Sequence, residues 1–409
     1  MLNPPGPRQP RGRPRGLLPG PSTTEQWNGE DMTARVRTTL AAACAVALSA
    51  ALAAPAVAAP AVHGHDATER ALRAAVADGV PGVTATARTD RRTWSRTAGV
   101  GDLRTGEPRS ERDRYRVGSI TKTFVATVLL QLEAEGRLSL DDTVGRWLPG
   151  VVEGHGHDGD RITLRRLLNH TSGVYDYTSD EGFVRDHFGR DGFAEHRYDT
   201  LTPRQLVAIA TAHEPAFAPG ARWEYSNTNY VLAGMVIEEA TGRPYAEEVR
   251  RRIVGPLKLR ATSLPGTRTG LPQPSSRAYS KLGGTATDPT YDVTRLNPSM
   301  AGSAGEMISD SADLNRFYTA LFRGGLLPAE QLAEMTTTVP ALPGASYGLG
   351  LIRRDLDCGV TVWGHAGGIH GSSSEAVTTR DGRHALALNF NGDWSGDSQA
   401  VIEAEFCGD

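Results

Sequence analysis

Residues 116–122 of this 409-residue chain read Arg-Val-Gly-Ser-Ile-Thr-Lys. The apolar spacing that follows predicts an amphipathic helix over 121–135, ended by Gly136, so Ser119 and Lys122 lie on the same face of its first turn. A lysine can be tuned to accept a hydroxyl proton, and the positive end of a helix favours the anion that then develops. The stretch therefore predicts a serine nucleophile activated by a lysine. A capping serine followed by a surface lysine is the structural alternative.

The balance of basic residues draws further attention to Lys122. Of 44 basic residues only three are lysines, the others being Lys258 and Lys281. A coding bias toward arginine explains most of this imbalance, but arginine stays protonated and cannot serve as a base. The formal net charge of -3 gives no basic field, so the composition does not indicate a nucleic-acid partner.

A second motif is Tyr225-Ser226-Asn227. Of the eleven tyrosines in the chain, Tyr225 alone has an asparagine two residues later. A phenol can relay a proton and an amide can hold a substrate carbonyl, so Tyr225 and Asn227 are candidate catalytic residues. The alternative is a capping turn, because a helix is predicted over 229–241.

A third motif, His365-Ala366-Gly367-Gly368, follows a predicted strand at 360–363. Glycines let a backbone approach a bound substrate closely, and the amide of Gly368 could pair with that of Ser119 as an oxyanion hole beside Gly367. The alternative is a packed histidine next to a hairpin, because His-x-Gly also occurs at His157 and His187.

The remaining pattern predicts an α/β (α+β) protein. Strands at both ends of the chain surround a long helical middle, which favours one antiparallel sheet formed by both chain ends, flanked by helices, with a mostly helical inserted subdomain over about 130–300. The predicted helices cover 67–77, 203–211, 229–241, 312–322 and about 396–405, and the predicted strands cover 82–87, 93–98, 347–352, 361–363 and 384–389. Residues 63–409 are expected to form this one domain.

The N-terminal residues look like a processing signal. Residues 1–31 are rich in Pro, Gly and Arg and predict a disordered extension, whereas 32–58 have the basic, apolar and small-residue order of a signal peptide. The apolar run is too short for a retained membrane anchor, so we expect a secreted protein. Cys44 would be removed with the signal, and Cys358 and Cys407 would form a disulfide in an oxidising compartment; two buried free thiols are the alternative.

Metal chemistry has little support in the sequence. His155 and His157 lie in a Gly-rich stretch, 153–160, that is more typical of a solvated polar loop than of a metal site. The chain has neither a His-Glu-x-x-His zinc motif nor a Gly-x-Ser-x-Gly nucleophile elbow. We therefore expect neither a metal nor a cofactor, and we do not expect the α/β-hydrolase fold.

The three motifs, in this order, resemble the penicillin-recognising serine hydrolases of the β-lactamase / D-alanyl-D-alanine carboxypeptidase superfamily. The resemblance is closest to soluble secreted serine D-alanyl-D-alanine carboxypeptidases and class C β-lactamases. It runs from about Thr68 to the end of the chain and includes residues 115–122, 167–173, 223–227, 303–309, 347–351 and 406–408. It implies a β-lactamase/transpeptidase-like fold and an acyl-enzyme on Ser119. It also implies that Lys122 and Tyr225 share the acid/base work, that Asn227 orients the acyl amide and that His365 supports the proton network.

The chain departs from this family where a carboxypeptidase grips the free carboxylate of its substrate. Ala366 and Gly368 replace two threonines, and Ile352 stands where the family's carboxypeptidases have an arginine. Arg354 shares a strand face with Ile352 and could reach the carboxylate instead. The expected activity is carboxypeptidase-like or β-lactamase-like, on D-amino-acid peptides or β-lactams. An esterase, another amidase or a slow-turnover penicillin-binding protein are the alternatives, and the expected partner is a small-molecule or peptide substrate.

Overall fold

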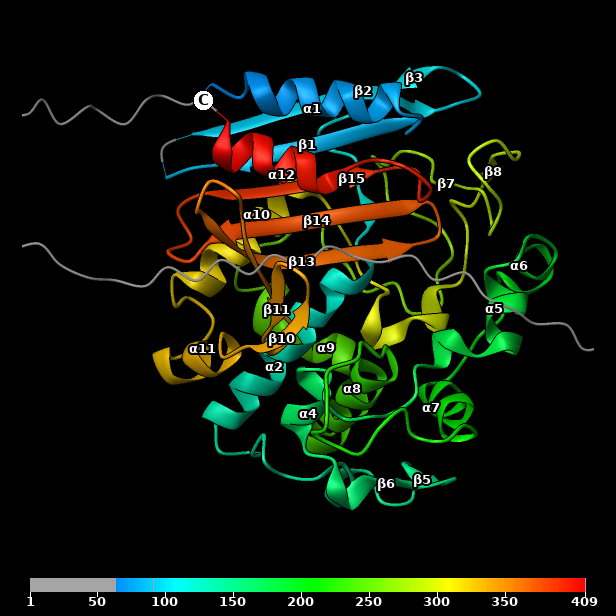
Figure 1. Ribbon diagram of the computed structural model, residues 1–409, viewed down its shortest axis with the longest axis vertical. Coiled ribbons are helices and arrows are strands. Elements are labelled where there is room, and N and C mark those ends of the chain that lie inside the picture. Colours follow the sequence, from blue (N-terminus) through cyan, green and yellow to red (C-terminus); the bar gives the residue numbers. More distant parts are fainter. Residues whose placement is uncertain (1–63, 91, 409) are drawn as a thin grey trace, which may run out of the picture. The chain divides into compact units, whose positions relative to one another are not determined.

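The computed structural model describes residues 64–90 and 92–408, which are built around a nine-stranded antiparallel sheet (Figure 1). Strand β1 (Gly82–Arg88) pairs with β15 (Ala385–Phe390) from Val83↔Phe390 to Arg88↔Ala385, so both chain ends meet in the middle of the sheet. This confirms the predicted fold class. The strand order is β10-β11-β12-β13-β14-β15-β1-β2-β3. The other strands are β2 (Thr93–Asp102), β3 (Glu107–Pro108), β10 (Val339–Leu342), β11 (Ala345–Tyr347), β12 (Ile352–Asp355), β13 (Thr361–Ile369) and β14 (Ser372–Thr379).

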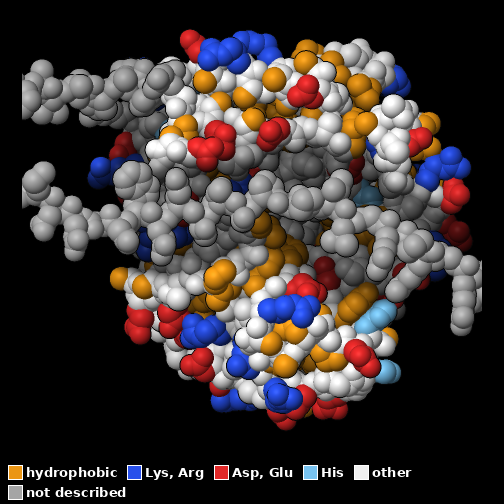
Figure 2. Space-filling model, viewed as in Figure 1, with side chains coloured by type: hydrophobic (Ala, Val, Ile, Leu, Met, Phe, Trp, Pro, Cys, Tyr) orange, Lys and Arg blue, Asp and Glu red, His pale blue; other side chains and the backbone are white. Residues whose placement is uncertain are grey.

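Helices cover both faces of the sheet. On β14 and β15, Val377 and Leu386 join one apolar cluster with α1 (Asp66–Ala77) and α12 (Ser398–Cys407). The alternate residues Ala376 and Ala387 point to the opposite face, where α10 (Ser311–Phe322) packs. On the face of the molecule that Figure 2 shows, acidic and basic side chains are interspersed.

Helix α2 (Thr121–Ala134), which carries Lys122, lies in the centre of the larger core. Every residue from Thr121 to Leu132 is buried except the half-buried Gln131. The prediction of an amphipathic helix was therefore wrong: α2 packs against α8 (Thr228–Thr241) and the turns around it, so it has no solvent face along most of its length. This burial puts a lysine in an apolar environment.

About half of the residues between α2 and residue 254 are helical, and the bounds of a separate subdomain stay a prediction. Helix α7 (Pro203–Thr211) begins as expected, with the Thr202 side chain accepting from the Gln205 amide. The other helices are α3 (Val144–Trp147), α4 (Leu164–Leu168), α5 (Glu181–His187), α6 (Arg190–His196), α9 (Tyr245–Val249) and α11 (Ala329–Met335). Short strand pairs join β4 (Tyr115–Arg116) to β9 (Ile308–Ser309), β5 (Glu153–Gly154) to β6 (His157–Asp158) and β7 (Tyr279–Ser280) to β8 (Tyr291–Asp292).

The structure differs from the predicted strands in three places. Residues 347–352 are a tight turn between β11 and β12, with Tyr347 paired to Ile352, rather than one strand. Gly350 has a positive φ of 71°, and a Cβ there would lie 2.8 Å from that of Ala126, so the turn packs against α2. Strand β14 was not predicted because its start is rich in serine. Residues 153–160, predicted as a loop, contain the β5–β6 pair.

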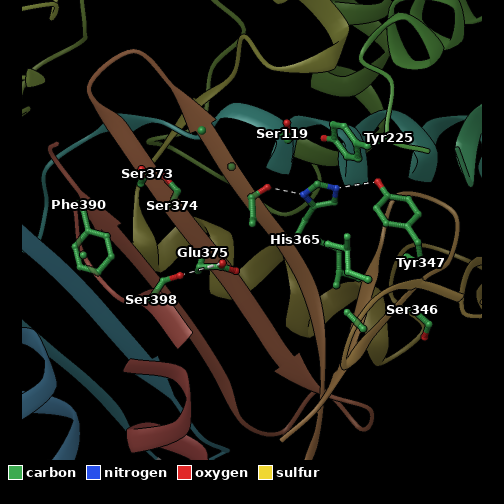
Figure 3. A pocket seen from close by; sticks show the side chains of 18 of the residues that line it. Ser119, Tyr225, Ser346, Tyr347, His365, Ser373, Ser374, Glu375, Phe390 and Ser398 are labelled. Atoms are coloured by element: carbon green, nitrogen blue, oxygen red, sulfur yellow. Dashed lines mark hydrogen bonds between the residues drawn. The ribbon is translucent and has the colours of Figure 1, made fainter. Parts of the chain in front are cut away.

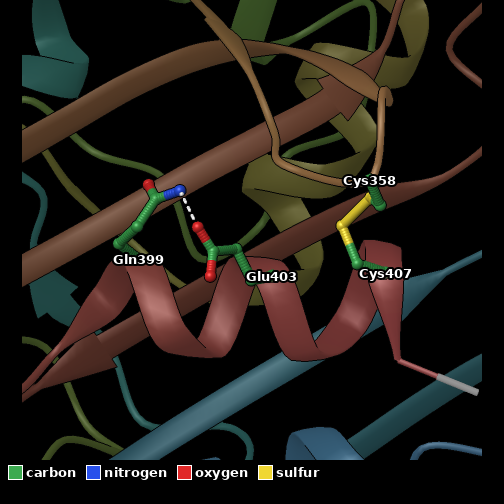
Figure 4. Close-up of a disulfide and its surroundings, with 4 residues drawn as sticks. All are labelled: Cys358, Gln399, Glu403 and Cys407. Carbon is green, nitrogen blue, oxygen red and sulfur yellow. Dashed lines mark hydrogen bonds between the residues drawn. A yellow bond between two sulfur atoms is a disulfide. The ribbon is translucent and has the colours of Figure 1, made fainter. Parts of the chain in front are cut away.

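Cys358 and Cys407 lie side by side, with their Cα atoms 5.7 Å apart, a separation that a disulfide spans (Figure 4). The predicted extension (1–31) and signal peptide (32–58) lie outside the described residues. Among the helices of residues 64–90 and 92–408, none is long and apolar enough to cross a membrane.

Candidate active site

Ser119 lies in a short 3₁₀ turn, Gly118–Ile120, that leads directly into α2. The turn is pressed against β13. Gly118 has a positive φ of 52°, and a Cβ on it would lie 2.7 Å from the nitrogen of Gly368. A Cβ on Gly367 would lie 1.9 Å from the carbonyl oxygen of Val117. Glycine is therefore required on both sides of the contact that sets Ser119 against β13.

The Lys122 ammonium nitrogen has three close neighbours. Its Nζ lies 2.9 Å from Ser119 Oγ, 2.8 Å from Asn227 Oδ1 and 2.7 Å from the carbonyl oxygen of Ala304. The Asn227 and Ala304 oxygens can only accept hydrogen bonds. A neutral amine has two hydrogens to donate and one lone pair. The neutral form thus donates to both oxygens and leaves its lone pair for the Ser119 hydroxyl hydrogen.

Burial sets the protonation state of Lys122. It lowers the pKa of the ammonium from 10.5 to about 7, and the nearby Asp176 carboxylate opposes the shift. A substantial fraction of Lys122 is therefore neutral at neutral pH and available as a base. The predicted nucleophile and base are together in the structure.

Asn227 contacts Lys122 through its side-chain amide. Its Nδ2 donates to Asp176 Oδ2 and to Thr178 Oγ1, both at 3.2 Å, and its Oδ1 faces Lys122. These contacts let Asn227 position the base, and its expected role of orienting the acyl amide stays a prediction. Asp176 could not be predicted from the sequence, because only the fold brings its loop to Asn227.

The Tyr225 hydroxyl lies next to Ser119 in the cavity (Figure 3). Its ring centroid is 4.9 Å from Lys122 Nζ. Burial raises the pKa of this phenol and the hydrogen bond with Ser119 lowers it, the net shift being upward. Tyr225 therefore carries its proton at neutral pH and can donate it to a leaving group.

His365 is buried on β13 and contacts Tyr347 instead of the Ser119–Lys122 pair. Its Nδ1 faces the carbonyl oxygen of Ala366, which can only accept, so Nδ1 carries the hydrogen. Its Nε2 then accepts from Tyr347 Oη at 2.8 Å (Figure 3). Burial lowers the pKa of His365 to about 3, with Lys122 acting in the same direction. The ring is neutral and orients Tyr347, and its expected support of the proton network stays a prediction.

His170 completes this chain, and its role was missed although its segment carried part of the family resemblance. Its Nδ1 accepts from the Ser226 amide at 3.2 Å and from Asn229 Nδ2 at 3.1 Å. Its Nε2 is therefore the donor, to Tyr347 Oη at 3.2 Å. The ring centroid lies 4.2 Å from that of Tyr225. His170 thus links the Tyr225 loop to the Tyr347–His365 pair.

Ser119 opens into a cavity of about 620 Å³ between β13, β14 and the β10–β11 hairpin. Among the described residues that line it there is no lysine or arginine. Gly367 and Gly368 line the cavity together with Ser119, and the oxyanion hole expected there stays a prediction. The large apolar and aromatic side chains of the wall are Trp223, Tyr225, Leu342, Tyr347, Ile352 and Phe390.

Arg354 does not line this cavity. Its Nη2 binds both carboxylate oxygens of Glu375, at 3.1 and 2.8 Å, and the Ser398 hydroxyl donates to the same carboxylate at 3.2 Å. Glu375 lines the cavity instead. The expectation that Arg354 grips a substrate carboxylate is therefore corrected, because its guanidinium is already paired.

Two solved structures resemble the chain over most of its length. The chain is 64% identical to a D-stereospecific amidohydrolase from Streptomyces sp., covering 85% of this chain and 99% of that one, with a TM-score of 0.81. It is 30% identical to the D-amino acid amidase from Ochrobactrum anthropi SV3 complexed with D-phenylalanine, covering 83% and 97%, with a TM-score of 0.71.

A curated relative, esterase EstB of Burkholderia gladioli, is 37% identical over 41% of this chain, and the match spans only 42% of that relative's length. The family model described as Beta-lactamase matches residues 66–405, which include all three motifs. Ser119 and Tyr225 line one cavity within this match, and Lys122 contacts Ser119. The chain belongs to the beta-lactamase family and is a serine hydrolase of that fold.

Proposed function

We propose that the protein is an exported amidohydrolase that cleaves amides of D-amino acids through an acyl-enzyme on Ser119. The observation that carries the proposal is the Ser119–Lys122 pair, 2.9 Å apart, at a cavity whose described lining has no cation for a substrate carboxylate. The 64% identical Streptomyces protein, described as D-stereospecific, supports the choice of substrate.

The first half-reaction forms the acyl-enzyme. Ser119 Oγ attacks the substrate carbonyl carbon while its proton passes to Lys122 Nζ. The amides of Ser119 and Gly368 hold the oxyanion of the tetrahedral intermediate. The C–N bond then breaks as Tyr225 protonates the departing amine, and Lys122 returns the proton to Tyr225. Water attacks the resulting ester in the second half-reaction and releases the D-amino acid.

An esterase is the second candidate. The apolar cavity wall and the relative named esterase EstB favour it. An alcohol leaves more readily than an amine, so ester cleavage depends less on protonation by Tyr225. The carboxypeptidase activity expected from the sequence has weaker support, because Arg354 is held by Glu375.

Export and a Cys358–Cys407 disulfide form part of the proposal. The signal-like order of residues 32–58 and the adjacency of the two cysteines support both. Peptide mapping of the mature protein without reductant is expected to recover the two cysteines in one linked fragment. Two separately alkylated cysteines would contradict the disulfide.

The function is tested with a substrate panel. D-phenylalanine amide, its L enantiomer, a p-nitrophenyl ester and a D-Ala-D-Ala peptide are compared with the wild-type protein and Ser119→Ala. We expect the D-amide to be hydrolysed faster than the L-amide, and Ser119→Ala to lose at least about 10³-fold in kcat. Ester turnover without amide hydrolysis would favour the second candidate, and full activity in Ser119→Ala would refute both.

A further inference from the structure

Side chains of three neighbouring strands lie on one face of the sheet beside the cavity. Strands β12, β13 and β14 pair Arg354 with Val362 and Ala366 with Glu375. Because side chains alternate along a strand, Ile352, Arg354, Ala366 and Glu375 point to the same side of the sheet. This is the side that α12 covers, since Val362 belongs to the apolar cluster of that helix.

Glu375 is the anchor of this face. Its side chain is 7% exposed, and its carboxylate is held by the Arg354 guanidinium and by the hydroxyl of Ser398, the first residue of α12. Figure 3 shows Glu375 beside Ser398 at the cavity wall. The positive charge of Arg354 is thus paired with Glu375 and does not face the cavity. The charged side chain that lines the cavity is the Glu375 carboxylate.

In the proposed reaction, the leaving group of the substrate occupies this same cavity. Tyr225, which would protonate the leaving group, lines the cavity together with Glu375. A second cavity of about 520 Å³ meets the first at Gly368 and Ser373, and Tyr225 does not line it. The side chain of the acyl group can extend into this second cavity. The part of the first cavity that Glu375 lines is then left for the departing group.

We infer that Glu375 determines substrate specificity by rejecting leaving groups that carry a free carboxylate. Its carboxylate pairs with the Arg354 guanidinium. It also places a negative charge directly opposite Ala366 on the neighbouring strand. Like charges brought together in a desolvated contact oppose binding, so neutral or cationic leaving groups are selected. The accepted class is then primary and substituted amides and esters. This inference rests on the proposed acyl transfer from Ser119 and defines the leaving-group side of that reaction.

The test is Glu375→Gln with a pair of substrates that differ only in charge. D-phenylalanyl-glycine ends in a carboxylate, and its N-methylamide does not; release of D-phenylalanine from each is followed by chromatography. Glutamine keeps the shape and the contact with Ser398 but frees the Arg354 charge. We expect the ratio of kcat/KM for methylamide over free acid to fall by about tenfold or more.

Two variants separate this effect from a general change of charge. Glu403→Gln removes one negative charge from α12, where Glu403 pairs with Gln399 (Figure 4) and does not line the cavity, and it should leave the ratio unchanged. Adding Arg354→Met to Glu375→Gln removes the freed cation and should abolish most of the gain for the free acid. Thermal unfolding of each variant checks that it folds.

An unchanged ratio in Glu375→Gln, or an equal shift in Glu403→Gln, would overturn the inference. If the wild-type protein cleaves neither dipeptide, the proposed amidase function fails. The same ratio is then measured with D-phenylalanyl esters of 4-hydroxybenzoic acid and 4-hydroxybenzamide, whose leaving groups again differ by a carboxylate. That comparison decides the role of Glu375 independently of amide cleavage.

Discussion

At the scale of single residues, the chemistry depends on a lysine kept neutral by its surroundings. Lys122 is fully buried, and two of its three neighbours are oxygens that can only accept. Those contacts orient its lone pair toward Ser119. An arginine could not replace it, because a guanidinium stays protonated and has no lone pair to offer.

The pH dependence follows from the pKa of Lys122, which burial lowers to about 7. Below this value the amine is protonated and cannot accept the Ser119 proton; above it the amine is neutral. We expect the logarithm of kcat/KM to rise with pH through about 7, with a slope of one against pH. Lys122→Arg should lower kcat/KM by about 10²- to 10⁴-fold. A rate that stays low until the pH nears 10 would show that the lysine is not perturbed.

The hydrogen-bond chain from His170 through Tyr347 to His365 gives a second prediction. Tyr347→Phe removes the hydroxyl between the two histidines, and His170→Asn keeps an acceptor for Ser226 but loses the donor to Tyr347. Each variant is expected to lower kcat by about tenfold for an amide, since small misplacements of catalytic groups are costly.

The double variant His170→Asn/Tyr347→Phe should be little worse than either single one, because both changes break the same chain. Additive losses would instead mean that the two residues act separately. Thermal unfolding shows whether either change merely destabilises the protein.

Sequence reasoning worked best for residues whose neighbours are local. Ser119 and Lys122 are three residues apart on one turn, so their contact could be predicted from spacing. The partners of Arg354 and Asn227 could not, because Glu375 and Asp176 reach them only through strand register and loop packing. The predicted substrate contact of Arg354 failed for this reason.

At the scale of elements, the site exists because η1 (Gly118–Ile120) and β13 touch backbone to backbone. Gly367 makes that approach possible, whereas a Cβ on its neighbour Gly368 would meet no atom within 4 Å. The two adjacent glycines therefore provide a matched pair of alanine variants.

Gly367→Ala is expected to push the turn away from β13 and lower kcat/KM by about 10²-fold, the effect of misplacing a nucleophile by about 1 Å. Gly368→Ala keeps its amide and should retain most of the activity. Steady-state kinetics on both variants measure the difference. Equal activity of the two would mean that the close contact does not position Ser119.

The predicted elements were most accurate where the hydrophobic period was clear. The helices at 203–211 and 229–241 and the strands at 82–87 and 93–98 match α7, α8, β1 and β2 within a few residues. The turn at 348–351 was predicted as strand because Leu349 and Leu351 are apolar, and both side chains are buried in the structure. Helix α2 lacks the polar face expected of it because it is buried on all sides along most of its length.

At the scale of the whole molecule, the buried carboxylate of Glu405 forms hydrogen bonds that connect the two ends of the domain. Glu405 on α12 accepts from Thr68 of α1 at 2.7 Å, from His384 at 2.7 Å and from His65 at 2.9 Å. Its side chain is 1% exposed. The pairing of β1 with β15 in the sheet also joins the two ends of the domain.

Glu405 gives a stability prediction with a defined sign. Burial would raise its pKa, but the hydrogen bonds from His384, His65 and Thr68 together lower it. A carboxyl with a lowered pKa stabilises the fold above its unfolded value, and this stabilisation is lost as the pH falls through its folded value. Glu405→Ala should cost about 1–3 kcal/mol at neutral pH by leaving buried donors unpaired.

Denaturant unfolding at several pH values checks this prediction: the difference between wild type and variant should shrink in acid. Activity per folded molecule should not change, because Glu405 does not line the cavity. A difference that is constant with pH would rule out the carboxylate as its source.

Mass spectrometry of the trapped acyl-enzyme tests whether Ser119, activated by Lys122, is the nucleophile. The wild-type protein is mixed with a D-phenylalanyl p-nitrophenyl ester, quenched with acid and digested. We predict an added D-phenylalanyl group on the peptide that contains Ser119, forming faster above pH 7 than below it and missing in Ser119→Ala. An adduct on another residue, or one that persists in Ser119→Ala, would contradict the assignment.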